Sequence, residues 1–312
     1  MKPSLSEMLG IEHSIIMAPM FLVTNVEMMI CALDNGITAA IPALNFRTDV
    51  DMRKALNEIK SHTSKPFGVN LIVNKSNIKL KKQLQTCLDL EVAFIITSLG
   101  NPKEIINKCK PKGIKVFCDV VDLDYAKKVE ASGADAVIAV NSQAGGHSGN
   151  LSPTELITML NSKLNIPVIS AGGISCKDDI DKALELGAQG VSVGTIFIAS
   201  DEAGVSKEYK NALVDYSASD IIMTSHISGT PVTVINTPYV KSLKHKNGWI
   251  TRKLTNNKRL KKIIKFIIMS KGMNSLKKAA TKPTYKTVWV AGPSIQNITK
   301  INSVTDIIKS LI

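Results

Sequence analysis

Short apolar runs rich in Ile and Val recur along the first two thirds of the chain, and their number and spacing constrain the fold more than any other feature. They begin near residues 14, 37, 67, 92, 114, 135, 166 and 190. Each run is continuously apolar instead of alternating, which is typical of strands that are buried on both faces. Most of the intervening segments carry helical patterns, such as "DVDMRKALNEIKSH" and "SPTELITMLNSKL". Eight strand and helix units in succession predict an α/β fold, a (β/α)8 TIM barrel.

The predicted barrel occupies residues 1–200 and leaves two further parts of the chain. We expect residues 201–284 to form a smaller, basic and mainly helical lobe, inserted near the C-terminus, that covers the barrel mouth. Residues 285–312 are expected to return to the barrel and to end in a helix over "SVTDIIKSLI".

The composition is that of a globular protein and argues against several other classes. Hydrophobic residues make up 44% of the 312 residues and charged residues 21%. No apolar run reaches the roughly 18 to 20 residues that a membrane span needs, and the start of the chain lacks the apolar core of a secretory signal. The five cysteines form no CxxC pair and show no ligand-like spacing, so neither a metal site nor a disulfide framework is predicted. We expect a cytoplasmic protein without membrane contact.

The positive charge of the chain is concentrated in residues 241–286. This segment holds thirteen Lys, two Arg and no Asp or Glu, whereas the whole chain has a net charge of +13. It is either a solvated helical face or a cationic surface that attracts an anionic substrate or an acidic partner. Nucleic acid is a less favoured partner, because only 4% of the residues are aromatic and no base-stacking motif is present.

In a (β/α)8 barrel the active site is built from the C-terminal ends of the strands and the loops that follow them. The strand-end positions are therefore the candidate site residues. They are Ala18, Pro19 and Met20 after the first run, Asn70 in the third, Ser98 in the fourth, Asp119 in the fifth, Gly145, Gly146 and His147 after the sixth, Gly172 and Gly173 after the seventh, and Gly194 and Thr195 after the eighth.

The last two strand ends favour a phosphate site. "SAGGIS" and "SVGTIF" place small residues where backbone N–H groups can approach a ligand closely, in the loops that usually bind phosphate in this fold. The alternative is that Gly172 and Gly173 only permit a tight turn. No P-loop and no strand-borne GxGxxG is present, so a mononucleotide such as FMN fits better than a dinucleotide.

Eight segments in order resemble the nitronate monooxygenases, formerly called 2-nitropropane dioxygenases. They include "IIMAPMFLVTN", "VNLIVNKSN", "AVNSQAGGHSGNLSP", "ISAGGIS" and "VGTIFIAS", and "VWVAGPSIQNI" resembles the closing family segment. The same elements occur in the related FMN-dependent enoyl-ACP reductases and NADH:quinone reductases. Gln143 departs from the family, which often has an acidic or small residue there.

The resemblance implies that FMN lies across the barrel mouth. Ala18, Pro19 and Met20 would line the isoalloxazine ring, Asn70 would hydrogen-bond its polar edge, and Asp119, at its strand end, is a further cofactor-binding candidate. Gly145, Gly146, Gly172, Gly173, Gly194 and Thr195 would surround the ring and the phosphate. His147 matches the catalytic histidine of the family, and its flanking glycines let the backbone pass close to a planar cofactor. His226, in the predicted lobe, is more simply explained as a surface or packing residue.

Three functions remain to be compared. The leading hypothesis is an FMN-dependent nitronate monooxygenase that acts on a small anionic nitronate, or on a nitroalkane, with O2. The second is an NAD(P)H-dependent FMN reductase of the same fold, acting on a quinone or on an enoyl thioester; the basic segment would then attract an acidic carrier protein. The third is a non-enzymatic flavin-binding or nucleic-acid-associated protein whose basic lobe is its working surface.

Overall fold

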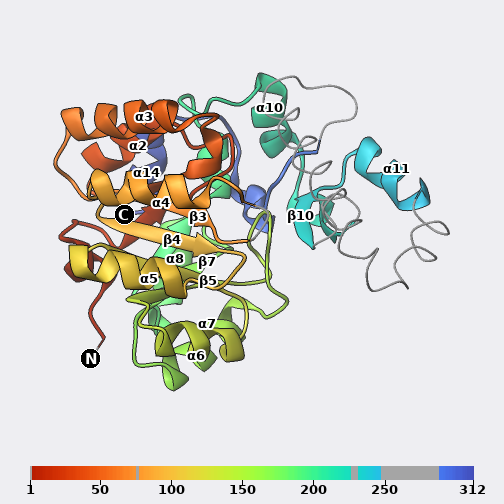
Figure 1. Ribbon diagram of the computed structural model, residues 1–312. Helices are drawn as coiled ribbons and strands as arrows, with labels where there is room; N and C mark the ends of the chain where they lie inside the picture. Colours follow the sequence, from red (N-terminus) through yellow and green to blue (C-terminus); the bar gives the residue numbers. More distant parts are fainter. Residues whose placement is uncertain (1, 75–76, 226–230, 247–287) are drawn as a thin grey trace.

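A closed barrel of eight parallel strands forms the centre of the protein. The computed structural model describes residues 2–74, 77–225, 231–246 and 288–312. The strands follow one another around the barrel in chain order, and the eighth pairs with the first. Figure 1 shows the barrel with helices packed around it. They are β1 (Ile15–Met17), β2 (Thr38–Pro42), β3 (Gly68–Ile72), β4 (Phe94–Ser98), β5 (Lys115–Val120), β6 (Ala136–Val140), β7 (Val168–Ala171) and β8 (Gly190–Val193). The barrel predicted from the apolar runs is therefore confirmed.

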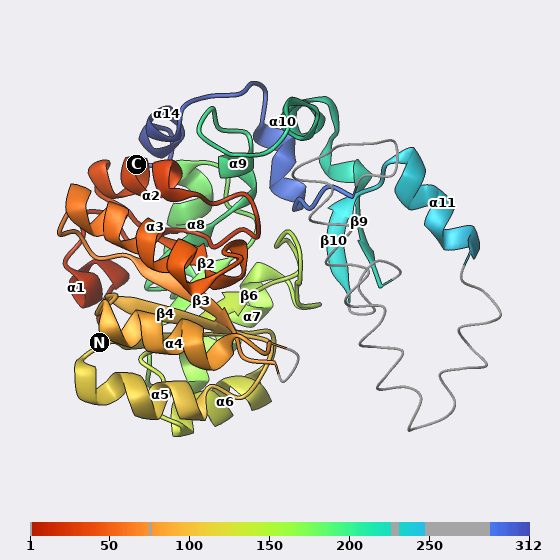
Figure 2. The same cartoon turned by 45° about the horizontal axis from the view of Figure 1, so that its top comes forward.

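Helices between the strands form the outer layer (Figure 2). They are α2 (Val26–Asp34), α3 (Asp49–His62), α4 (Leu80–Asp89), α5 (Lys103–Cys109), α6 (Leu123–Ala131), α7 (Pro153–Lys163) and α8 (Lys177–Glu185). α3 shows how local sequence sets these bounds. The Thr48 side chain accepts a hydrogen bond from Asp51 N–H, and the Asp51 carboxylate accepts one from Thr48 N–H. These two reciprocal hydrogen bonds form a capping box, which fixes the start of the helix. Met52, Leu56 and Ile59 then form its buried face.

The interior of the barrel is apolar at its N-terminal end. Phe94 and Phe117 stack there with ring centroids 5.1 Å apart, in a cluster that includes Ile16 and Ile138. The short helix α1 (Leu5–Leu9) closes this end, because Leu5 is fully buried in the same cluster. The barrel is thus a packed core at this end, and Asn70, Ser98 and Asp119 lie toward the other end.

The chain after β8 builds a small structure beyond the C-terminal ends of the strands. It contains α9 (Thr195–Ile198), α10 (Lys207–Asp215), the antiparallel pair β9 (Ile221–Thr224) and β10 (Val232–Ile235), and α11 (Pro238–Lys246). We call β9 and β10 the hairpin; Figures 1 and 2 both show it beside the barrel mouth. His226 and most of the basic segment 241–286 lie outside the described residues.

The C-terminal segment contacts the hairpin and the outer helices of the barrel. Val290 forms an antiparallel bridge with Val234 of β10, and α14 (Val304–Lys309) packs beside α2, where Asn35 donates a hydrogen bond to the Thr305 hydroxyl at 3.0 Å. Short 3-10 helices complete the described chain: η1 (Ala43–Asn45), η2 (Lys110–Lys112), η3 (Ala218–Asp220) and η4 (Pro293–Asn297). Within the described ranges, no helix combines the length and the apolar character needed to cross a membrane.

Candidate active site

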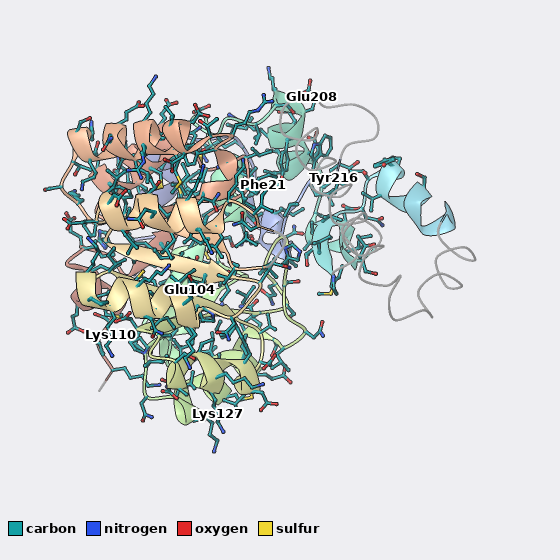
Figure 3. The ribbon with its side chains drawn as sticks, in the orientation of Figure 1. Phe21, Glu104, Lys110, Lys127, Glu208 and Tyr216 are labelled. Atoms are coloured by element: carbon teal, nitrogen blue, oxygen red, sulfur yellow. The ribbon has the colours of Figure 1, made fainter. Side chains whose placement is uncertain are left out.

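The strand-end residues singled out from the sequence lie at the end of the barrel that faces the hairpin. Asn70, Ser98 and Asp119 lie on β3, β4 and β5, and the others follow β1, β6, β7 and β8. Phe21 and Tyr216 lie on this side of the molecule, away from Lys110 and Lys127 (Figure 3). The parallel strands bring these positions together because all eight end at one edge.

A line of hydrogen bonds crosses three neighbouring strands at this edge. The Asn70 amide donates to Ser98 Oγ at 2.8 Å, and Ser98 Oγ donates to Asp119 Oδ2 at 2.5 Å. Asp119 is half-buried, and the surrounding atoms desolvate its carboxyl enough to raise its pKa to about 6, although the Ser98 hydrogen bond acts in the opposite direction. The mouth therefore contains a carboxyl group that titrates just below neutral pH.

The loops after β7 and β8 form a surface on which small residues expose backbone. Gly172 and Gly173 have φ values of 110° and 83°, which L side chains rarely adopt. The N–H groups of Gly173 and Gly194 donate to no acceptor among the described residues. A Cβ at Gly194 would lie 3.6 Å from both Ala18 Cβ and Met20 Sδ, which is an ordinary contact distance. The space between the ends of β1 and β8 is therefore not filled by side chains at this point. N–H donors that lack an acceptor among the described residues suit an anionic group such as a phosphate.

The loop that carries His147 is anchored at its start by Asn141. This fully buried amide donates to Gly172 O at 3.0 Å and accepts from Gln143 N at 2.8 Å. Gly145 lies against the C-terminal segment, because a Cβ there would come within 2.9 Å of Gly292 N. Gly292 N in turn donates to Thr195 Oγ1 at 3.0 Å. Glycine is therefore needed at positions 145 and 292, where the His147 loop, the C-terminal segment and the start of α9 meet.

The hairpin holds both neighbours of His147. Gly146 and Thr233 exchange two backbone hydrogen bonds of 3.2 and 2.7 Å, and the hydroxyl oxygens of Ser148 and Thr233 lie 2.7 Å apart. Sequence reasoning missed Thr233 and the packing role of Gly292. The Gly-Pro pair in "AGPS" was the only local sign of Gly292, and nothing marked Thr233.

His147 itself is reached by water but has protein around it. Its side chain is solvent-exposed, and the surrounding atoms nevertheless remove enough solvent to lower the pKa of the imidazole below its ordinary value of 6.5. The neutral imidazole therefore prevails at pH 7, and a neutral imidazole can accept a proton.

Two other features of the described chain lie away from this site. A cavity of about 240 Å³ lies between the loop after β2 and the start of α4, with Arg47, Lys79 and Lys82 among its lining residues. None of the strand-end residues named above lines it. No group of three or more His, Cys, Asp or Glu side chains within the described ranges could hold a metal ion.

The comparison with known families decides what this site belongs to. The nitronate monooxygenase family model matches residues 76–312, which is most of the chain. The chain belongs to the nitronate monooxygenase family. The prediction from "AGGH" and its companion segments is therefore confirmed, and the chain is an oxidoreductase.

Individual relatives of this nitronate monooxygenase family member differ in their activities. A probable nitronate monooxygenase of Staphylococcus haemolyticus is 29% identical, over 78% of this chain and 81% of the relative. A (3aS,4S,5R,7aS)-5-hydroxy-7a-methyl-1-oxo-octahydro-1H-indene-4-carboxyl-CoA dehydrogenase of Rhodococcus jostii is 30% identical, over 78% and 69%. Among solved structures, FabK from Thermotoga maritima superposes with a TM-score of 0.86 at 29% identity, over 98% of this chain and 94% of FabK. The family is thus shown, whereas its members differ in substrate.

Proposed function

We propose that the chain is an FMN-dependent nitronate monooxygenase that converts an alkyl nitronate and O2 to a carbonyl compound and nitrite. The observation that carries the proposal is the placement of His147: a neutral imidazole, flanked by glycine, that the hairpin holds beside the polar end of the barrel. The family match and the Staphylococcus relatives support the same activity.

The residues at the strand ends fit FMN in size and chemistry. The N–H groups of Gly173 and Gly194, which donate to no acceptor within the described part of the chain, suit its phosphate. No acidic residue lies between β7 and α8 or between β8 and α9. Ala18, Pro19 and Met20 would border the ring, and Asn70 would meet its polar edge. When bound, the flavin supplies the electron acceptor for the nitronate and the route to O2.

His147 would have two tasks that depend on the form of the substrate. With a neutral nitroalkane, an imidazole nitrogen would take the α-proton, and the carbon would keep the electron pair as a nitronate. With a preformed nitronate no proton needs to be removed, so the imidazole would only orient the nitro group. The lowered pKa of His147 keeps it competent as a base at neutral pH.

A second function has specific support. An NAD(P)H-dependent FMN reductase acting on a quinone or an enoyl thioester is favoured by the similarity to FabK and by the +15 segment 241–286, which would attract an acidic carrier protein. The chemistry at the flavin would then begin with a hydride donor instead of a nitronate.

Anaerobic stopped-flow reduction distinguishes the two functions. We expect the purified yellow protein to bleach rapidly with propyl nitronate and slowly or not at all with NADH and NADPH. Rapid bleaching by either nicotinamide, with none by the nitronate, would replace the monooxygenase with the reductase. A protein that binds no flavin would exclude both.

A further inference from the structure

The line from Asn70 to Asp119 has a direction that the described hydrogen bonds determine. The Asn70 amide group lies 2.8 Å from Ser98 Oγ and 3.3 Å from Ile96 O. A carbonyl oxygen only accepts, so the Asn70 atom that faces Ile96 O is the nitrogen. The same nitrogen therefore also donates to Ser98 Oγ.

The single hydroxyl proton of Ser98 goes to Asp119. The Ser98 Oγ to Asp119 Oδ2 distance of 2.5 Å is that of a charge-assisted hydrogen bond. A carboxylate accepts only, whereas an amide at position 119 could donate or accept. The acidic residue thus fixes which way the Ser98 O–H points, and Ser98 keeps its lone pairs for Asn70.

This arrangement leaves one polar atom of Asn70 unused. Asn70 Oδ1 accepts no hydrogen bond from the described residues. Among the described residues, the buried side-chain polar atoms without a hydrogen-bond partner are Ser170 Oγ, Asn236 Oδ1 and Trp289 Nε1, and Asn70 Oδ1 is not one of them. Solvent therefore reaches Asn70 Oδ1, although the residue as a whole is only 7% exposed. The barrel mouth offers a ligand a fixed hydrogen-bond acceptor at this point.

We propose that Asp119 is a positioning residue: through Ser98 it holds the amide of Asn70 so that Oδ1 is offered to an N–H donor of the bound cofactor. This inference rests on the flavin of the proposed function. The oxidised isoalloxazine ring has one N–H group, at N3, so an acceptor at position 70 can serve only that edge of the ring. Asp119 would act on flavin recognition without touching the flavin.

A purely structural role, in which the line only braces three strands, makes a different prediction. Bracing would affect stability and the binding of every flavin alike, whereas positioning affects the recognition of N3–H. The matched control is Thr97→Val, because Thr97 contacts Cys118 Sγ at 3.2 Å between the same two strands, one residue earlier and on the opposite strand face.

The test compares FMN with N3-methyl-FMN on the apoprotein by fluorescence titration. We expect the wild type to prefer FMN by roughly 10-fold to 100-fold, the worth of one buried hydrogen bond with its partner left unpaired. Asp119→Leu and Ser98→Ala should reduce this preference to about 3-fold or less. Asp119→Asn should lie between, and Ser98→Thr and Thr97→Val should keep the wild-type preference. Thermal melting of each apoprotein checks that the variants fold.

A second readout needs no flavin. In ¹⁵N-labelled apoprotein the Asn70 side-chain amide signals should shift and exchange faster in Asp119→Leu and Ser98→Ala, but not in Thr97→Val. Unchanged Asn70 signals in Asp119→Leu would overturn the inference, and so would an undiminished preference for FMN over its N3-methyl form. A wild type that binds no flavin would defeat the proposed function and the assignment to a flavin N–H, while the Asn70 signals would still decide whether Asp119 positions this amide.

Discussion

The hydroxyl oxygens of Ser148 and Thr233 lie 2.7 Å apart, and Thr233 also exchanges two backbone hydrogen bonds with Gly146. One residue of the hairpin thus holds both neighbours of His147. The position of the loop that carries His147 therefore depends on a strand that comes 85 residues later in the chain.

Thr233→Val removes the hydroxyl contact and keeps the β-branched shape and the backbone pairing. We expect kcat/KM for a nitronate to fall about 2-fold to 10-fold, the usual net worth of one hydrogen bond, while flavin content and melting temperature stay near those of the wild type. Ser148→Ala should have a similar effect. The double variant should be no worse than either single one, because both remove the same contact; additive losses would show that the contact does not position His147.

His147→Asn tests whether His147 acts as the general base toward a nitroalkane. The variant should bind FMN and fold normally, yet lose roughly 10² to 10⁴ in kcat/KM for a neutral nitroalkane, the usual contribution of general base catalysis. A preformed nitronate needs no deprotonation, so its turnover should fall much less. Equal losses on the two substrates would make His147 a binding residue.

The pH profile of the wild type follows from the same imidazole. Since burial lowers the pKa of His147, the rising limb of kcat/KM for the nitroalkane should have its midpoint below 6.5, the ordinary value for histidine. His147→Asn should lack that limb. A midpoint above the ordinary value would show that the atoms around His147 do not disfavour the charged imidazole.

Gly173→Asp tests the phosphate site. A Cβ at Gly173 would lie 2.3 Å from Gln143 Oε1, and the φ of 83° strains any L residue, so Gly173→Ala is the control that carries the steric cost without the charge. We expect the alanine variant to bind FMN more weakly and the aspartate variant to lose it. Equal affinities would place the phosphate elsewhere, and recovery of FAD instead of FMN would refute the cofactor assignment.

Asp119→Asn should stabilise the apoprotein at high pH. The pKa of Asp119 rises from 3.8 to about 6 on folding, so between these values the folded protein holds a proton that the unfolded chain has lost, and stability falls as the pH rises. At pH 8 the asparagine variant should gain on the order of 3 kcal/mol in unfolding free energy, less what the weaker hydrogen bond to Ser98 costs. At pH 4 the gain should be much smaller; urea unfolding at both pH values measures it, and equal gains would refute the burial effect.

The strands and the strand-end residues could be predicted because their causes are local. Burial on both faces makes each strand a continuous apolar run, and close packing at the strand ends requires glycine at positions such as Gly145 and Gly172. The partners of these residues depend on distant segments. Ser98 meets Asp119 only because Thr97 pairs with Cys118 in the barrel register, and the pairing of Thr233 with Gly146 leaves no trace in either local sequence.

Leu5 closes the N-terminal end of the barrel. This side chain is fully buried in one cluster with Ile16 and Phe94, so apolar packing closes the end of the barrel opposite Asn70. A nitronate, O2 and the departing carbonyl compound would then all enter and leave at the C-terminal ends of the strands, beside the hairpin. A lingering product would obstruct the next substrate, so inhibition by the carbonyl product should be competitive with the nitronate.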